Sequence, residues 1–177
     1  MHRLFVAVQP PPHIRTQLLS AMGGIARARW QKDEQLHLTL RFIGEVDRHR
    51  AEDSAAALGT VHHPRFSIAV DGIGQFDKRG RVDALWAAIQ PQEPLRTLHN
   101  KIDMALERVG IPPEGRTYLP HITLAPFGRG TGPIGGFMAE QGGLSSTSFL
   151  VEDFCLYESQ LSQEGSIYNV VERYPLN

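Results

Sequence analysis

The feature that most constrains this chain is a short motif, His-x-Thr-Leu, that occurs twice within apolar runs. The first copy is Leu36-His37-Leu38-Thr39-Leu40, and the second, 84 residues later, is Pro120-His121-Ile122-Thr123-Leu124. In an extended strand successive side chains point to opposite faces, so each copy places its histidine and threonine on one face and its apolar residues on the other. Each copy therefore predicts a strand with one buried face and one polar face, on which the imidazole and the hydroxyl lie roughly 7 Å apart.

A strand and an amphipathic helix precede each copy of the motif. Repeated supersecondary units usually pack about a pseudo-twofold axis, which would bring the two motifs together around a cleft. We therefore expect an α+β fold of two pseudo-twofold-related lobes, each an antiparallel sheet with helices on its outer face, forming a single bilobal domain over residues 1–177. The predicted units are Leu4–Val8, His13–Arg27 and Leu36–Phe42 in the first half, and Ala84–Ile89, Leu95–Val109 and His121–Leu124 in the second.

Three further segments complete the prediction. Asp47 suits the N-cap of a helix that continues to about Leu58. The segment 128–143 contains seven glycines and one proline, which is typical of a loop. The turn around Gln163-Glu164-Gly165 separates two strand-like runs and predicts a closing hairpin.

Composition narrows the classes of partner. Apolar residues make up 41% of the chain and charged residues 21%, which is ordinary for a globular protein. The net charge of −1 argues against a broad basic surface that coats nucleic acid, although a local arginine cluster can still grip one phosphate. Cys155, the one cysteine, cannot form an internal disulfide, and no apolar run reaches membrane-spanning length. We expect a cytoplasmic monomer without a membrane partner.

The residue types in the two motifs favour acid–base chemistry. Two histidines without further ligands make a poor metal site, and the chain has no H-E-x-x-H, phosphate-binding loop or G-x-S-x-G elbow. A protonated imidazole can give a proton to a leaving oxygen while a neutral one takes a proton from water, and threonine hydroxyls can hold phosphate oxygens. In-line opening of a cyclic phosphodiester suits this set, with no metal and no cofactor. The repeat leaves open which histidine is the acid.

The paired motifs resemble those of the 2H (two-histidine) phosphoesterase superfamily. The start Arg3–Val8, the run Leu36–Gly44, the second motif and the ending Leu156–Ser159 with Gly165 and Tyr168 are similar to the RNA 2′,3′-cyclic phosphodiesterases, also called 2′-5′ RNA ligases. The resemblance implies metal-independent hydrolysis of an RNA 2′,3′-cyclic phosphate end, or of a small cyclic nucleotide, to a 2′-phosphomonoester. It also implies that His37 is the proton donor, that His121 is the proton acceptor, and that Thr39 and Thr123 bind the phosphate.

One departure from the family pattern leaves a question about substrate binding. Members often carry an arginine where this chain has Pro126. Arg41 and Arg129 are the candidate substitutes, although an arginine in such a position is more often a solvated surface charge. Phe5 shares its strand face with Ala7, as the family's site-lining aromatic does, and either stacks on a base or ribose or packs in the core.

Two alternative functions remain at this stage. The first is a phosphodiesterase that acts on other cyclic nucleotide phosphates or on 2′-5′ linkages. The second is a nucleotide-binding module that keeps the pocket and performs no chemistry.

Overall fold

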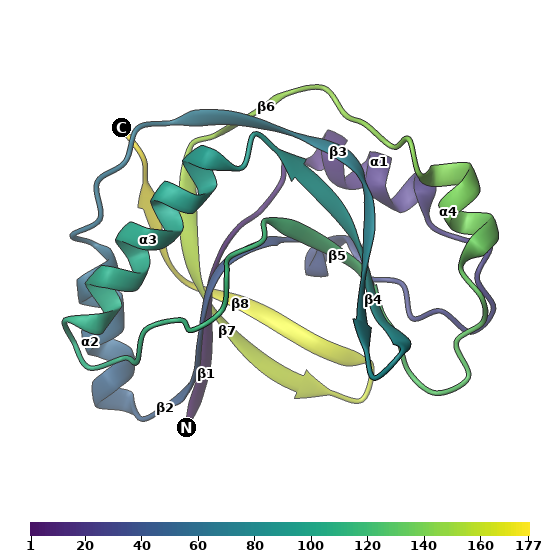
Figure 1. The fold of residues 1–177 in the computed structure, drawn as a ribbon. Helices are drawn as coiled ribbons and strands as arrows, with labels where there is room; N and C mark the ends of the chain where they lie inside the picture. The colour runs from purple at the N-terminus through teal and green to yellow at the C-terminus, as the bar shows by residue number, and fades with distance from the viewer.

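Eight antiparallel strands form one curled sheet in the computed structural model, which describes residues 1–177 (Figure 1). Their order across the sheet is β6-β3-β4-β5-β2-β1-β7-β8, so the strands that carry the two motifs, β2 and β5, lie at the centre. The strands are β1 (His2–Val8), β2 (Leu38–Val46), β3 (Phe66–Lys78), β4 (Arg81–Gln90), β5 (His121–Pro126), β6 (Phe149–Val151), β7 (Asp153–Ser162) and β8 (Gly165–Pro175).

Four α-helices and one 3₁₀ turn complete the fold. They are α1 (Pro12–Ala21), η1 (Asp33–Gln35), α2 (Arg48–Leu58), α3 (Glu93–Glu107) and α4 (Gly135–Gln141). Leu95, Leu98 and Ile102 recur at helical spacing in α3 and are fully buried. The side chain of Asp47 accepts a hydrogen bond of 2.8 Å from the backbone N–H of Arg50, which confirms its prediction as the N-cap of α2. None of the helices is long and apolar enough to cross a membrane.

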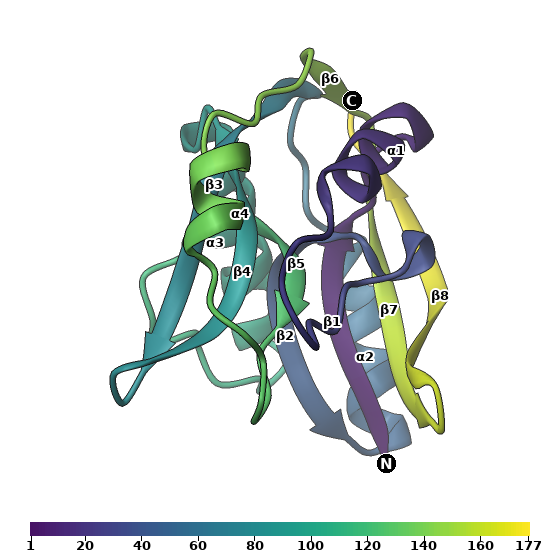
Figure 2. The same ribbon diagram turned by 90° about the vertical axis from the view of Figure 1, so that its right-hand side faces the viewer.

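The sheet has two halves of four strands that meet between β2 and β5. These two strands pair through a single residue pair, Leu38 with Ile122, because in this register they overlap only at their first residues. Figure 2 shows β3, β4 and β5 turned away from β1, β7 and β8 across this junction. The α+β class and the antiparallel pairing are confirmed. The prediction of separate sheets in two lobes needs correction, because one continuous sheet runs through both halves.

The two faces of the sheet have different characters. The face that carries Leu4, Val6, Leu38 and Ile122 packs into the main core together with the helices. The opposite face carries a small apolar cluster of Phe5, Ala7, Cys155 and Tyr157. Because alternate residues of β1, β2 and β5 point to opposite faces, the apolar residues of both motifs lie in the main core and the polar ones lie on the other face.

Two local predictions differ from the structure. The helix expected over 13–27 ends at Ala21, before Gly23 and Gly24, whose φ angles are positive. The glycine-rich segment 128–143 is not all loop, because α4 forms within it over Gly135–Gln141. The predicted closing hairpin is present as β7 and β8.

Candidate active site

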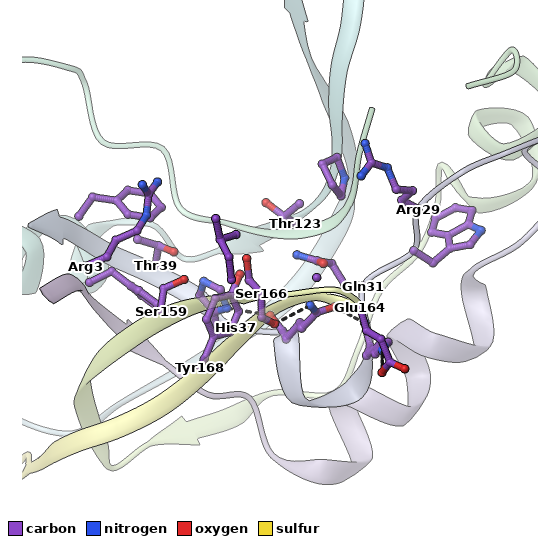
Figure 3. Close-up of a pocket in the computed structure, with 18 of the residues that line it drawn as sticks. Arg3, Arg29, Gln31, His37, Thr39, Thr123, Ser159, Glu164, Ser166 and Tyr168 are labelled. Atoms are coloured by element: carbon purple, nitrogen blue, oxygen red, sulfur yellow. Dashed lines mark hydrogen bonds and ion pairs between the residues drawn. The ribbon is translucent and has the colours of Figure 1, made fainter. Parts of the chain in front are cut away.

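The pairing of β2 with β5 brings both His-Thr motifs to one place. Continuing the antiparallel register from Leu38 and Ile122 sets His37 opposite Thr123, and Thr39 opposite His121. The two histidines are therefore diagonal neighbours across the junction of the two strands. All four side chains line one cavity of about 1010 Å³, and Figure 3 shows His37, Thr39 and Thr123 directed into it.

The backbone orients both imidazole rings in the same way. Nδ1 of His37 lies 2.7 Å from the carbonyl oxygen of Gln35, and Nδ1 of His121 lies 2.7 Å from the carbonyl oxygen of Leu119. A carbonyl oxygen only accepts, so Nδ1 of each ring must donate its proton. Nε2 of each neutral ring is then unprotonated, and it has no hydrogen-bond partner within the protein. Each histidine thus presents a free proton-accepting nitrogen, with its tautomer fixed by the chain two residues upstream.

Aromatic rings enclose the two histidines differently. The ring centroid of His37 lies 4.9 Å from that of Phe5 and 5.1 Å from that of Tyr168, which meets it edge-on. His121 lies 4.9 Å from Phe76, also edge-on, and 5.8 Å from Trp86. Aromatic rings displace water from one side of each imidazole, so they disfavour its charged form.

Burial accordingly lowers the pKa of both histidines. The pKa of His37 falls from 6.5 to about 4, mainly by loss of hydration and with a smaller contribution from His121, although the Gln35 carbonyl opposes the shift. The pKa of His121 is also lowered by burial and is partly restored by the Leu119 carbonyl. In the protein alone, therefore, both rings are neutral at pH 7.

Three cationic side chains reach the same cavity, namely Arg3, Arg29 and Lys32. Lys32 lies 3.7 Å from a carboxylate oxygen of Glu164, whereas the guanidinium groups of Arg3 and Arg29 have no carboxylate partner. Arg29 lies beside the segment that follows the second motif, since a Cβ built on Gly128 would be 3.1 Å from its Nη2 atom. Figure 3 shows Arg29 on the same side of the cavity as Thr123.

The two arginines that the sequence singled out lie elsewhere. Neither Arg41 nor Arg129 lines the cavity. Arg41 is 6% exposed, and its Nε donates to a carboxylate oxygen of Asp103 at 2.8 Å, while its terminal nitrogens donate to the carbonyls of Phe42 and Pro112. Arg129 is exposed in the segment between β5 and α4.

A β-bulge explains the position of Arg41. Strict alternation would place it on the face of His37 and Thr39, but the pairing with β1 shifts between Val6 and Ala7, so that Ala7 pairs with Thr39 and Val6 with Arg41. The extra residue turns Arg41 toward the main core. Phe42 then pairs with Phe5 and lines the cavity.

Phe5 packs in the core and also borders the cavity. It is only 4% exposed and stacks on Tyr157 with centroids 5.2 Å apart, yet it also lines the cavity. Sequence reasoning did not assign a site role to Arg29 or Tyr168. Tyr168 could have been found from the sequence, because it lies in a strand-like run of alternating residues. Arg29 lies in an irregular connection, where no pattern indicates which way a side chain points.

The structure contains no group of three or more His, Cys, Asp or Glu side chains that could hold a metal ion. Groups with hydrogen-bonding hydroxyls, free imidazole nitrogens and unpaired guanidinium groups surround the cavity instead. This combination suits an anionic ligand whose reaction needs general acid–base catalysis.

Comparison with known proteins gives a consistent result. The family model described as "LigT like Phosphoesterase" matches residues 8–86 and 88–168, and each matched segment contains one His-Thr motif. The chain is 30% identical to the RNA 2′,3′-cyclic phosphodiesterase of Escherichia coli K12 over 180 residues, which is 98% of this chain and 96% of that protein. It is also 30% identical to the protein of the same name from Aeropyrum pernix, over 79% of this chain and 81% of the relative.

Solved structures agree with the sequence comparison. The crystal structure of E. coli LigT complexed with 3′-AMP superposes with a TM-score of 0.81 and 27% identity, over 99% of this chain and 98% of that one. The same protein complexed with NADP⁺ gives a TM-score of 0.78 and 26% identity, over 99% of this chain and 98% of that one. This structural relative of the chain therefore binds nucleotides.

Proposed function

The chain belongs to the LigT-like phosphoesterase family, and from that premise we propose that it hydrolyses the 2′,3′-cyclic phosphate end of RNA to a 2′-phosphomonoester. The observation that carries the proposal is the pair of free Nε2 atoms, presented from diagonal positions of two neighbouring strands into one cavity. Curated relatives that match most of this chain are named RNA 2′,3′-cyclic phosphodiesterases.

The proposed reaction requires two proton transfers at one phosphorus atom. Nε2 of His121 takes a proton from a water molecule, whose oxygen forms a bond to phosphorus. The bond from phosphorus to the ribose 3′-oxygen breaks in line with this attack, and His37 gives its proton to the leaving oxygen. The phosphate stays on the 2′-oxygen. At the end His121 is protonated and His37 is neutral, so a proton must return to His37 before the next turnover.

The low pKa of His37 sets a condition on this mechanism. A donor with a pKa of about 4 carries little proton at pH 7. A bound phosphodiester is an anion, and an opposite charge within about 4–6 Å favours the protonated imidazole and raises its pKa. Substrate binding thereby creates the charged form of the donor, and the reacting group is protonated only when the phosphate is in place.

Thr39, Thr123 and Arg29 complete the proposed phosphate site. The threonine hydroxyls lie on the same face as the histidines and can donate to the non-bridging oxygens. We assign Arg29 as the cation that binds the phosphate. It has no carboxylate partner, and it lies beside Gly128, close to where the second motif ends. Phe42 and Tyr168 offer aromatic surface for the terminal nucleoside, and the buried ring of Phe5 lies behind them.

A short RNA that ends in a 2′,3′-cyclic phosphate tests the proposal directly. Chromatography against 2′- and 3′-phosphate standards should identify the 2′-phosphomonoester as the product, with and without EDTA. His37→Ala and His121→Ala should each lower kcat by at least about 100-fold, because each removes one proton-transfer group. His49→Ala is the matched control, since His49 is exposed on α2 and outside the cavity. Full activity in either cavity variant contradicts the mechanism.

The same cavity could serve a different ligand. Because nucleotide-bound structures of a relative superpose on this chain, a cyclic mononucleotide or a 2′-5′ linkage is the second candidate substrate. Turnover of 2′,3′-cyclic AMP at a kcat/KM equal to that of the RNA would favour it. Calorimetric binding of 2′-AMP without any hydrolysis would instead favour a binding module.

A further inference from the structure

The two His-Thr motifs are linked by a contact outside the cavity. The hydroxyl of Tyr118 donates a hydrogen bond of 2.8 Å to the carbonyl oxygen of Thr39. Tyr118 lies three residues before His121, in the segment that leads from α3 into β5. The side chain of Tyr118, which lies just before the second motif, therefore holds the backbone of Thr39 in the first motif.

A buried histidine supports this contact. His99 on α3 is 5% exposed, and its ring stacks on that of Tyr118, with centroids 4.3 Å apart and an angle of 3° between the planes. Its Nδ1 lies 2.6 Å from the carbonyl oxygen of Leu40, the residue after Thr39. The stacked pair thus holds two successive carbonyls of β2.

The position of these carbonyls explains why side chains are needed there. Strands β2 and β5 pair only through Leu38 and Ile122, so the edge of β2 that follows has no neighbouring strand to complete a ladder. A backbone carbonyl without a partner is costly to bury and leaves its residue free to shift. The hydroxyl of Tyr118 and the ring of His99 provide the partners that β5 does not.

We infer that Tyr118 and His99 are positioning residues for the hydrolysis proposed above: they fix Thr39 relative to His121 through the carbonyls of Thr39 and Leu40. The inference rests on the proposed function. Neither residue needs to touch the substrate. Their effect lies in the geometry of the transition state, where a misplacement of about 1 Å can cost up to 100-fold in rate.

Tyr118→Phe is the decisive variant because it keeps the stacked ring and removes only the hydroxyl. Tyr174→Phe is its matched control, since the Tyr174 hydroxyl also donates to a backbone carbonyl, that of Ala55, at 2.8 Å, in the core beside α2. We expect Tyr118→Phe to lower kcat by about tenfold with KM changed less than about twofold, and Tyr174→Phe to leave both unchanged. Rates are expressed per folded molecule, with the unfolding midpoint measured for each variant.

A second pair of variants tests the same contact from α3. His99→Gln keeps a side-chain donor for the Leu40 carbonyl, whereas His99→Leu has none. The glutamine variant should therefore retain more of the wild-type kcat than the leucine variant. Equal kcat values for these two, or a Tyr118→Phe variant as active as Tyr174→Phe, would overturn the inference.

The imidazole NMR signals of His37 and His121 give a readout that needs no turnover. They should shift in Tyr118→Phe and not in Tyr174→Phe. A wild-type protein that hydrolyses no cyclic phosphate would refute the proposed function, while these signals would still decide whether Tyr118 positions the site. Unchanged signals in Tyr118→Phe, with an active wild type, would refute the positioning role alone.

Discussion

Burial of His37 makes a quantitative prediction about stability and pH. Its pKa in the folded protein is about 4, against an ordinary value of 6.5. Since the folded-state value is the lower one, both states are neutral at pH 7 and His37 then has no net effect. Between pH 6.5 and 4 the unfolded chain binds a proton that the folded protein excludes, so stability falls as the pH falls. Linkage gives a loss of roughly 2 kcal/mol at pH 5 from this residue alone.

The variant His37→Gln isolates this effect, because glutamine does not titrate. Urea unfolding followed by tryptophan fluorescence, at pH 7 and again at pH 5, gives the loss of unfolding free energy for each protein. The wild type should lose about 2 kcal/mol more than the variant, since other titrating groups are common to both and cancel in the difference. Equal losses in the two proteins would show that water reaches the His37 ring and would refute the argument from burial.

A bound phosphate should raise the pKa of His37 in the folded protein. NMR titration of the His37 ring should give a pKa near 4 without ligand, and a higher value with 2′-AMP bound, because the phosphate charge favours imidazolium. The proposed donor role requires this rise. A ring that remains neutral at pH 7 in the complex could not protonate the leaving oxygen, and His37 would have to act as the base instead.

Three other substitutions probe separate parts of the molecule. Arg29→Gln should raise KM for the cyclic phosphate by about tenfold, as measured by initial rates, whereas Arg129→Gln, outside the cavity, should not change it. Gly74→Ala places a Cβ within 2.2 Å of the Trp86 ring, so overpacking should lower the unfolding free energy by about 1–3 kcal/mol and reduce kcat, because Trp86 lies against the ring of His121, the proposed proton acceptor. Asp47→Ala removes the cap of α2 and should cost about 1 kcal/mol in urea unfolding with kcat unchanged, and a matching loss of activity would contradict this.

The sequence predicted the elements whose pattern is local. Alternation in the two motifs was sufficient to place the histidines and threonines on one face of their strands, and the helical spacing of α3 identified its buried side. The position of Arg41 could not be read in this way, because the bulge that turns it inward arises from pairing with β1. The helix α4 was missed since its glycines predict a loop, while packing of Phe137 against Trp30, with centroids 5.3 Å apart, stabilises it.

Contacts between distant segments had no sequence signal. Arg29 reaches the cavity because its connection packs beside Gly128, which is a consequence of the whole fold. Tyr118 and His99 read as ordinary residues of a loop and an amphipathic helix, because their hydrogen bonds to β2 depend on where β5 begins beside it. The roles of these three side chains depend on tertiary structure, so local sequence patterns do not predict them.

The single pair between Leu38 and Ile122 also explains how the site can exist. In the register of that pair, β2 begins at Leu38 and β5 begins at His121, so the two strands overlap only within the two motifs. This short overlap is enough to bring both motifs to one cavity. Because β5 begins at His121, the residues of β2 after Thr39 have no strand partner on that side. Carbonyls without a partner are costly to bury, and Tyr118 and His99 hydrogen-bond to the carbonyls of Thr39 and Leu40 at this point.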